Sequence, residues 1–242
     1  MWNANALEPL RAIASLFYPP ACAICSLPVA VSEQLCVKCA SKAPRIEPPF
    51  CSRCSEPFAG AITEVFSCAN CEHRILHFES AVAAYRSRGV VRRIIHEFKY
   101  GHQLHLRHPI AGWLHETLDD PRLRGRRFDA VVPVPLHPAR QRERGFNQAL
   151  LLTELLSARA TLPLRDVLQR IRFTTTQTAF DRAERMENLR DAFRLRKNID
   201  VRGWRVLLID DVLTTGATMS ECARVLKASG AISVHAATAA RA

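Results

Sequence analysis

The stretch that decides the fold reads Val206-Leu-Leu-Ile-Asp-Asp-Val-Leu-Thr-Thr-Gly-Ala-Thr218. Its first four residues form an apolar run of the kind that is buried on both faces of a parallel sheet. The run ends in Asp210 and Asp211, and carboxylates are disfavoured inside a strand but frequent at its carboxyl end, where α/β sheets bind ligands. We therefore expect a strand over residues 204–210 that leads directly into a ligand site.

The second half of the stretch has the composition of a phosphate cradle in front of a helix, which we expect over residues 219–228. A glycine lets backbone N–H groups approach a ligand closely, a helix start adds a positive dipole end, and hydroxyls donate to phosphate oxygens. The adjacent carboxylates accept hydrogen bonds from the two ribose hydroxyls. The cradle residues are Thr214, Thr215, Gly216, Ala217 and Thr218.

The alternative without a ligand is a capped helix after a strand, because Asp and Thr are common N-cap residues. Caps account for one Asp and one Thr, not for the whole set. Other nucleotide motifs are missing, with neither a GxGxxG after a strand nor a GxxxxGK[ST] in the chain. The thirteen residues 206–218 resemble, without a gap, the phosphoribosyl diphosphate fingerprint of type I phosphoribosyltransferases. We thus expect Asp210 and Asp211 to be catalytic and to act with Mg²⁺.

A second segment, Val131-Val-Pro-Val-Pro-Leu136, reads as a strand over residues 129–135 that runs into prolines. Three arginines at alternate positions and a glycine turn follow before an apolar helix pattern at residues 148–157. Backbone donors in a turn and guanidinium groups suit a diphosphate leaving group. The expected substrate-binding residues are Pro133, Val134, Pro135, Arg140 and Arg144.

The rest of the second half of the chain alternates strands with helices. Such alternation indicates βαβ units and a parallel sheet with flanking helices. Residues 170–188 are polar and rich in Thr and Arg, and a connection of this length is a candidate lid. Further strands are expected at 81–85 and 232–237, and further helices at 90–98 and 110–118.

Length and charge are those of a globular protein with an anionic partner. The 242 residues are 48% apolar, and Lys plus Arg exceed Asp plus Glu by 34 − 23 = 11. The excess gathers at residues 86–99, 122–127 and 140–144, which suits a polyphosphate ligand or a nucleic-acid backbone. A cationic surface kept for solubility is the alternative for any one cluster.

The N-terminus does not resemble a signal peptide, since its first twenty residues contain one Arg and three Pro. No stretch has the roughly 18 consecutive apolar residues of a membrane span. We expect a cytoplasmic protein. A short helix within residues 1–18 would dock on its own protein or on a partner.

Eight of the nine cysteines fall before residue 72, in a region of little periodicity. They form four CxxC pairs, and two such pairs complete a four-sulfur shell around one tetrahedral zinc ion. Disulfides would need an oxidising compartment that the N-terminus does not indicate. We expect two structural zinc ions with sequential pairing, a cross-brace being the alternative. The ligands are Cys22, Cys25, Cys36, Cys39, Cys51, Cys54, Cys68 and Cys71.

Taken together, VPVPLHPARQRERGFNQA and LLIDDVLTTGAT resemble the ComF family of double zinc ribbon and phosphoribosyltransferase-domain proteins. Residues 85–101 are similar to the family's helix and K-[FY]-x-G turn, which implies a ligand role for Lys99. The candidate lid matches the family pattern through Arg170, Gln177 and Arg185, among others. Phe180 departs from it, where a smaller aliphatic residue is usual.

The resemblance implies a type I phosphoribosyltransferase-like parallel sheet at 76–242, a double zinc-ribbon module at 19–75 and an N-terminal helix at 1–18. It also implies a role in natural competence and uptake of single-stranded DNA, and it leaves the ribosyl acceptor open. The alternative to a transferase is a non-enzymatic factor that binds nucleic acid or a competence helicase and uses the site as a ligand sensor.

Overall fold

The computed structural model describes residues 20–30, 33–60, 65–173 and 189–242. The expected N-terminal helix and most of the candidate lid, with Gln177 and Arg185, lie outside the described residues. The strands are β1 (Ala81–Arg86), β2 (Ala130–Pro133), β3 (Leu168–Arg170), β4 (Phe193–Leu195), β5 (Arg205–Leu213) and β6 (Ser233–Arg241). The helices are α2 (Val37–Ala40), α3 (Ala69–Glu72), α4 (Gly89–Tyr100), η2 (Leu104–Leu106), α5 (Arg107–Glu116), η3 (Thr117–Asp119), α6 (Pro138–Arg144), α7 (Gln148–Ala160) and α9 (Ala217–Ala228).

A four-stranded sheet in the order β1-β6-β5-β2 forms the centre of the molecule, and every pairing in it is parallel. The strand–helix alternation predicted this parallel sheet. The expected end of β5 at Asp210 was wrong, because the strand continues to Leu213. It does so because β6 pairs with it as far as Arg241, opposite Leu213. Both carboxylates thus lie on rigid strand backbone.

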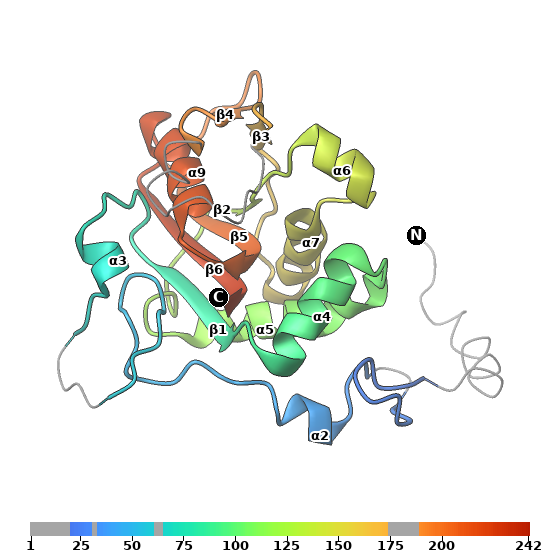
Figure 1. The fold of residues 1–242 in the computed structure, drawn as a ribbon. Coiled ribbons are helices and arrows are strands. Elements are labelled where there is room, and N and C mark those ends of the chain that lie inside the picture. Colours follow the sequence, from blue (N-terminus) through green and yellow to red (C-terminus); the bar gives the residue numbers. More distant parts are fainter. Residues whose placement is uncertain (1–19, 31–32, 61–64, 174–188) are drawn as a thin grey trace.

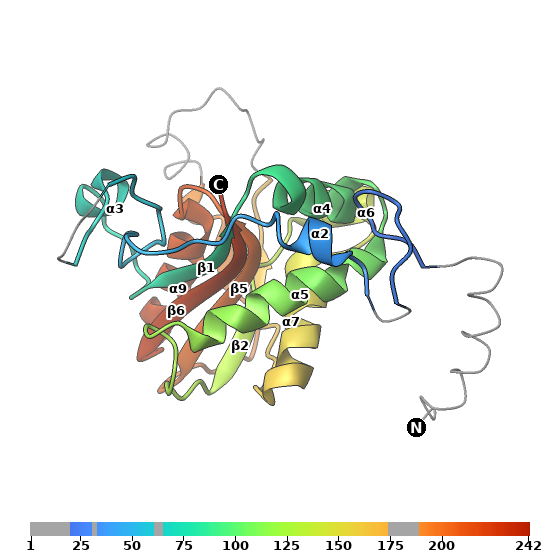
Figure 2. The ribbon, with the colours of Figure 1, turned by 90° about the horizontal axis from the view of Figure 1, so that it is seen from below.

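Helices cover both faces of the sheet (Figures 1 and 2), with α4, α5 and α7 on one side and α9 on the other. Side chains alternate along β5, so that Leu207 and Ile209 join the cluster beneath α4, α5 and α7. Val206 and Leu208 join the cluster on the α9 side. These clusters hold the two faces of the sheet in place, and they leave its carboxyl edge for ligands.

The N-terminal module covers the outer edge of β1. Ile46 N–H donates to Ala84 O at 3.0 Å and Arg86 N–H donates to Pro44 O at 2.8 Å. Arg45 forms an antiparallel bridge with Tyr85 between them. An edge strand offers unpaired backbone groups that invite association with other chains. The connection between the two cysteine groups satisfies part of this edge within the chain.

Three further elements differ from the expectation. Residues 138–144, expected as a turn, form helix α6, and β3 pairs with β4 in a small antiparallel sheet that the pattern did not predict. Within α6, Gln141 N–H donates to His137 O and Gly145 N–H donates to Gln141 O. The N–H groups of Gln141 and Gly145 are therefore bonded within the helix and cannot donate to a ligand. The side chains of α6 remain to bind one.

Candidate functional site

Adjacent carboxylates point to opposite faces of β5 near its carboxyl end. Lys99 on α4 places its Nζ 2.5 Å from Asp211 Oδ2, and the Asp211 side chain is only 2% exposed. Asp210 accepts a hydrogen bond from the Asp211 N–H at 2.9 Å through its Oδ1. The structure thus brings together three of the predicted site residues from two elements, α4 and β5.

The surroundings of the two carboxyl groups shift their pKa values in opposite directions. Burial and the neighbouring charge of Asp211 raise the pKa of Asp210 well above the usual range. Burial also opposes ionisation of Asp211, but the positive charge of Lys99 outweighs it and lowers the pKa of Asp211. Burial of Lys99 is likewise outweighed, by the charges of Asp211 and Asp210, so its pKa is raised. A Lys99–Asp211 ion pair therefore lies beside a carboxyl group that gives up its proton less readily, because the two adjacent acids titrate together.

The turn between β5 and α9 has the backbone geometry of a cradle. Gly216 is the N-cap of α9 with φ +78°, and a Cβ there would lie 3.5 Å from the Phe78 ring. Thr215 Oγ1 accepts from the Ala217 N–H at 3.3 Å. The first N–H groups of a helix have no acceptor within the helix, so they are available to an anion in this turn.

Residues within and just after the second cysteine group contact this turn and the start of α9. Asn70 on α3 donates to Thr215 O at 3.4 Å, and Ser220 Oγ in the first turn of α9 accepts from His77 N–H at 3.1 Å. Asn70 lies between Cys68 and Cys71 in the chain. The sequence carried no signal for these contacts, because their partners are more than 140 residues apart.

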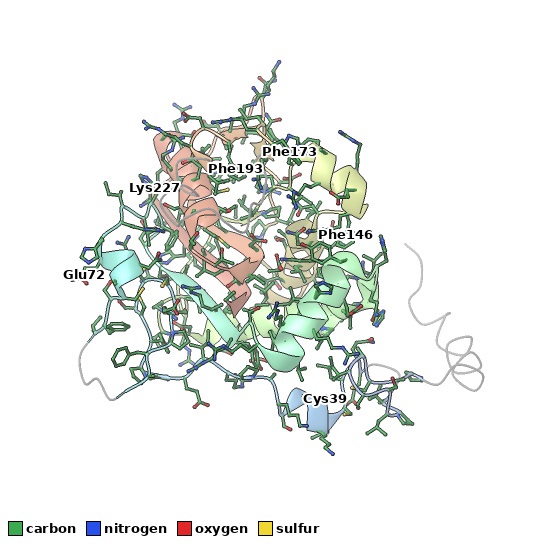
Figure 3. All side chains as sticks on the ribbon, in the orientation of Figure 1. Cys39, Glu72, Phe146, Phe173, Phe193 and Lys227 are labelled. Atoms are coloured by element: carbon green, nitrogen blue, oxygen red, sulfur yellow. The ribbon has the colours of Figure 1, made fainter. Side chains whose placement is uncertain are left out.

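A cavity of about 220 Å³ opens between the end of α4 and α6. Arg144 lies over the Tyr100 ring at 5.0 Å and Arg140 over the Phe173 ring at 5.8 Å. Figure 3 shows Phe173 beside α6. The lining residues are Lys99, Tyr100, His102, Arg140, Glu143 and Arg144. The structure therefore joins Lys99 to the two predicted arginines, and it adds Tyr100, His102 and Glu143, which the prediction omitted.

The strand end before α6 is less available than expected. Pro133, Val134 and Pro135 are buried, and Val134 uses both of its backbone groups within the protein. Its N–H donates to Ile209 O at 2.9 Å, and its carbonyl accepts from Asn147 Nδ2 at 3.2 Å. The geometry thus fits a role for these residues in positioning α6 against β5.

Arg170 ends β3 at the start of the candidate lid. Its guanidinium lies over the Phe193 ring at 5.3 Å, and burial lowers its pKa. The opposing charge of Asp210 acts on it from β5. Arg170 therefore lies on the Asp210 side of the sheet, whereas Lys99 pairs with Asp211 on the other side.

The eight cysteines gather in the two sequential groups that were expected. In each group the four sulfur atoms lie within 4.8 Å of one another. Cys25 Sγ and Cys36 Sγ are 3.6 Å apart in the first group, as are Cys54 Sγ and Cys68 Sγ in the second. Tetrahedral zinc with bonds of ~2.3 Å requires sulfur atoms ~3.8 Å apart. The residues therefore fit two structural zinc ions. Figure 3 shows Cys39 and Glu72, which mark the first and second group, at separate places on the molecule.

Comparisons with known proteins agree with this arrangement. A double zinc ribbon domain matches residues 13–75, and a phosphoribosyl transferase domain matches residues 147–242. Adenine phosphoribosyltransferase from Thermoanaerobacter pseudethanolicus is 16% identical, with a TM-score of 0.37, over 67% of this chain and 79% of that one. Among the described residues, no helix combines the length and apolar character needed to cross a membrane.

Relatives that match most of the chain carry names that refer to competence and to DNA utilization. Competence protein F of Haemophilus influenzae is 31% identical over 67% of this chain and 73% of that protein. DNA utilization protein YhgH of Escherichia coli is 30% identical over 88% of this chain and 87% of that protein. Their extent, with the two domain matches, establishes that the chain belongs to the ComF family of double zinc ribbon and phosphoribosyltransferase-domain proteins.

Proposed function

We propose that the chain binds phosphoribosyl diphosphate at the carboxyl ends of β5 and β2 and transfers its phosphoribosyl group to a nitrogen acceptor in the handling of DNA. The observation that carries this proposal is the position of the two carboxylates. Asp210 and Asp211 lie beside Lys99 and directly before the Gly216 turn of α9. One short segment therefore offers partners for the ribose diol and for the 5-phosphate.

Each part of the ligand finds a chemical partner. The carboxylates accept hydrogen bonds from the ribose hydroxyls and stabilise positive charge as it develops on the sugar. The residues Thr214, Thr215, Gly216, Ala217 and Thr218 hold the 5-phosphate through N–H groups and hydroxyls. Arg140 and Arg144 offset the charge of the departing diphosphate.

The transfer step balances without another reagent. The bond between ribose C1 and the diphosphate oxygen breaks, and the diphosphate leaves with the electron pair. A bond from the acceptor nitrogen to C1 forms, and the nitrogen loses a proton to the departing diphosphate or to water. We expect Arg170, with Gln177 and Arg185, to contribute to the same binding site.

The carboxylates also fit the oxygen ligands that Mg²⁺ prefers, since this ion is held by one or two carboxylates together with substrate phosphates. When bound, the ion supplies positive charge that neutralises the diphosphate. Asp210 and Asp211 are the residues that would hold it, directly or through the ribose hydroxyls.

Calorimetry with phosphoribosyl diphosphate and Mg²⁺ tests the binding part of the proposal. The Asp210→Ala plus Asp211→Ala protein should lose at least about tenfold in affinity, because charge-assisted hydrogen bonds to the diol are removed. Asp166→Ala plus Asp200→Ala removes the same charge from exposed ion pairs away from this site and serves as the matched control. Unchanged affinity in the double site variant would refute the proposal.

The same titration should depend on pH through Asp210. Its raised pKa means that the carboxyl group is protonated below that pKa and charged above it. Affinity for the ligand should increase as pH rises through this pKa, and Asp210→Asn should abolish the increase. Release of diphosphate against a panel of bases, amines and DNA then tests whether an acceptor exists.

A second candidate function is direct binding of single-stranded DNA or of a helicase partner, with the phosphoribosyl site as a sensor. The net charge of +11 and the names of the relatives favour it. Binding through the phosphate backbone should weaken steeply as the salt concentration rises. A gel-shift assay at low salt that shows no complex would remove this function.

A further inference from the structure

A second cationic pocket lies at the carboxyl ends of β1 and β6, next to the end of β5 but lined by none of the residues of the turn that follows it. Its volume is about 470 Å³, within the range of roughly 300–1,000 Å³ that small-molecule sites occupy. It shares no residue with the cavity between α4 and α6. The side chains that matter to its chemistry are Glu56, Arg86, Ser87, Arg88, Arg92 and Arg241.

Charge in this pocket is strongly unbalanced. Four arginines line it against one acidic side chain, Glu56, which pairs with Arg241. In the part of the chain that the structure describes, Arg86, Arg88 and Arg92 form no ion pair. Three guanidinium groups without a counter-charge around one hollow create a potential that attracts anions.

The start of α4 adds backbone donors to the same pocket. Its N-cap, Arg88, has no side-chain cap hydrogen bond. Its first residue, Gly89, has φ +52°, and a Cβ at this position would have no neighbour within 4 Å. This twelve-residue helix therefore begins at the carboxyl end of a parallel strand, and its first N–H groups have no acceptor within the helix. The β5–α9 junction has the same arrangement of strand, positive-φ glycine and helix.

Arg241 gives the pocket a fixed charge. Its side chain is 5% exposed, and its guanidinium is anchored by Glu56 and by Leu213 O at 3.3 Å. Its Nε has no hydrogen-bond partner among the residues that the structure describes. Arg241 is therefore a positive charge that is held in place at the wall of the pocket, and the neighbouring arginines supply the donors that can reach a ligand.

We infer that this pocket binds the phosphate group of a small phosphomonoester, of the size of a mononucleotide. Arginine forks and a helix N-terminus are the donors that recognise phosphate, and the volume admits more than an inorganic ion. This second phosphate site is independent of the proposed transferase, since it shares no residue with the turn after β5. It would hold a phosphorylated ligand beside the catalytic edge of the same sheet.

Calorimetry on the full, zinc-loaded chain tests this inference with inorganic phosphate, a nucleoside 5′-monophosphate and the nucleoside alone. Both phosphates should bind and the nucleoside should not. Arg88→Ala plus Arg92→Ala should weaken phosphate binding at this site about tenfold or more. Arg93→Ala plus Arg124→Ala removes the same charge from exposed positions outside the pocket, one of them on α4, and should change affinity less than about twofold.

A Thr214→Ala plus Thr215→Ala variant separates the two phosphate sites. It should leave the binding that depends on Arg88 and Arg92 intact, whether or not the transferase proposal holds. The inference is wrong if phosphate binding is absent, if it survives Arg88→Ala plus Arg92→Ala unchanged, or if the control variant loses it equally. Thermal unfolding of each variant verifies that the fold is retained.

Discussion

The two zinc ribbons use the same metal-binding loop in opposite settings. Residues 22–28 and 51–57 share the pattern C-x-x-C-S-x-P. In the first loop Cys22 N–H donates to Leu27 O at 2.7 Å, and in the second Cys51 N–H donates to Glu56 O at 2.8 Å. Their central serines have φ of 59° and 58°. The backbone of the loop therefore follows from the motif and not from its surroundings.

Substituents at matched positions decide where each loop lies. Arg53 of the second loop donates to Leu76 O at 3.0 Å, whereas Ile24 occupies the same position of the first. Glu56 pairs with Arg241, whereas its counterpart Leu27 is 52% exposed. Two polar anchors thus attach one ribbon to the phosphoribosyltransferase domain, and their absence leaves the other at its margin.

The consequence appears in the core. All four cysteines of the second group are buried in one cluster with Val206 and Leu208 of β5, whereas Cys25 of the first group is exposed. The second ribbon also contacts the phosphate cradle through Asn70. The second zinc-binding site is therefore part of the phosphoribosyltransferase domain, whereas the first lies at its surface.

Loss of a zinc ligand should have very different effects in the two ribbons. Cys54→Ser should abolish cooperative unfolding of the phosphoribosyltransferase domain. The binding free energy of a structural zinc ion is ~10–16 kcal/mol, whereas the net free energy of unfolding of a domain is only ~5–15 kcal/mol. Cys25→Ser should leave that domain folded with one zinc ion per chain. Circular dichroism melts and zinc content by mass spectrometry measure both outcomes. Equal damage from the two substitutions would contradict the division of roles.

Arg122 joins the second ribbon to the phosphoribosyltransferase domain. Its replacement should cause the next largest loss of stability. It pairs with Asp120 at 2.7 Å and donates to Ser52 O at 3.0 Å and Ser55 Oγ at 2.9 Å. Arg122→Ala leaves the half-buried Asp120 without its partner and removes the hydrogen bonds to the ribbon, which should cost about 1.5–3 kcal/mol of unfolding free energy. Exposed Arg124→Ala is the control and should stay within ~0.5 kcal/mol. Urea unfolding distinguishes the two variants. A loss of less than ~1 kcal/mol of unfolding free energy for Arg122→Ala would mean that Arg122 does not hold the ribbon to the domain.

The sequence predicted the elements that have strong apolar patterns or fixed ligand spacing. The apolar run before Asp210 predicted the central strand, and the CxxC spacing predicted the sequential zinc groups. Helix α6 was missed because it has no buried residue and therefore no apolar periodicity. Strands β3 and β4 have three residues each, too few to show alternation.

The parts of the site that could not be predicted depend on contacts between distant residues. Lys99 stabilises the charge of Asp211 inside β5, which is why the strand tolerates a carboxylate that would otherwise end it. Asn70 reaches the phosphate cradle across 145 positions of the chain. No local pattern records either contact, because each follows from how the layers pack.

The finest test of the two ribbons exchanges their matched serines for alanine. Ser55 is fully buried, donates to Ala81 O at 3.0 Å and accepts from Ala83 N–H at 3.2 Å. Ser55→Ala leaves these backbone groups unsatisfied and should cost about 1–3 kcal/mol. Ser26→Ala occurs at the same φ in an exposed loop, so it carries the same backbone cost and should change stability by less than ~0.5 kcal/mol. Ser55 Oγ also accepts from Arg122 Nη2 at 2.9 Å, so the difference in urea midpoint at equal slope measures the hydrogen bonds of Ser55 to β1 and to Arg122 together. A difference of zero would mean that these hydrogen bonds do not hold the second ribbon in place.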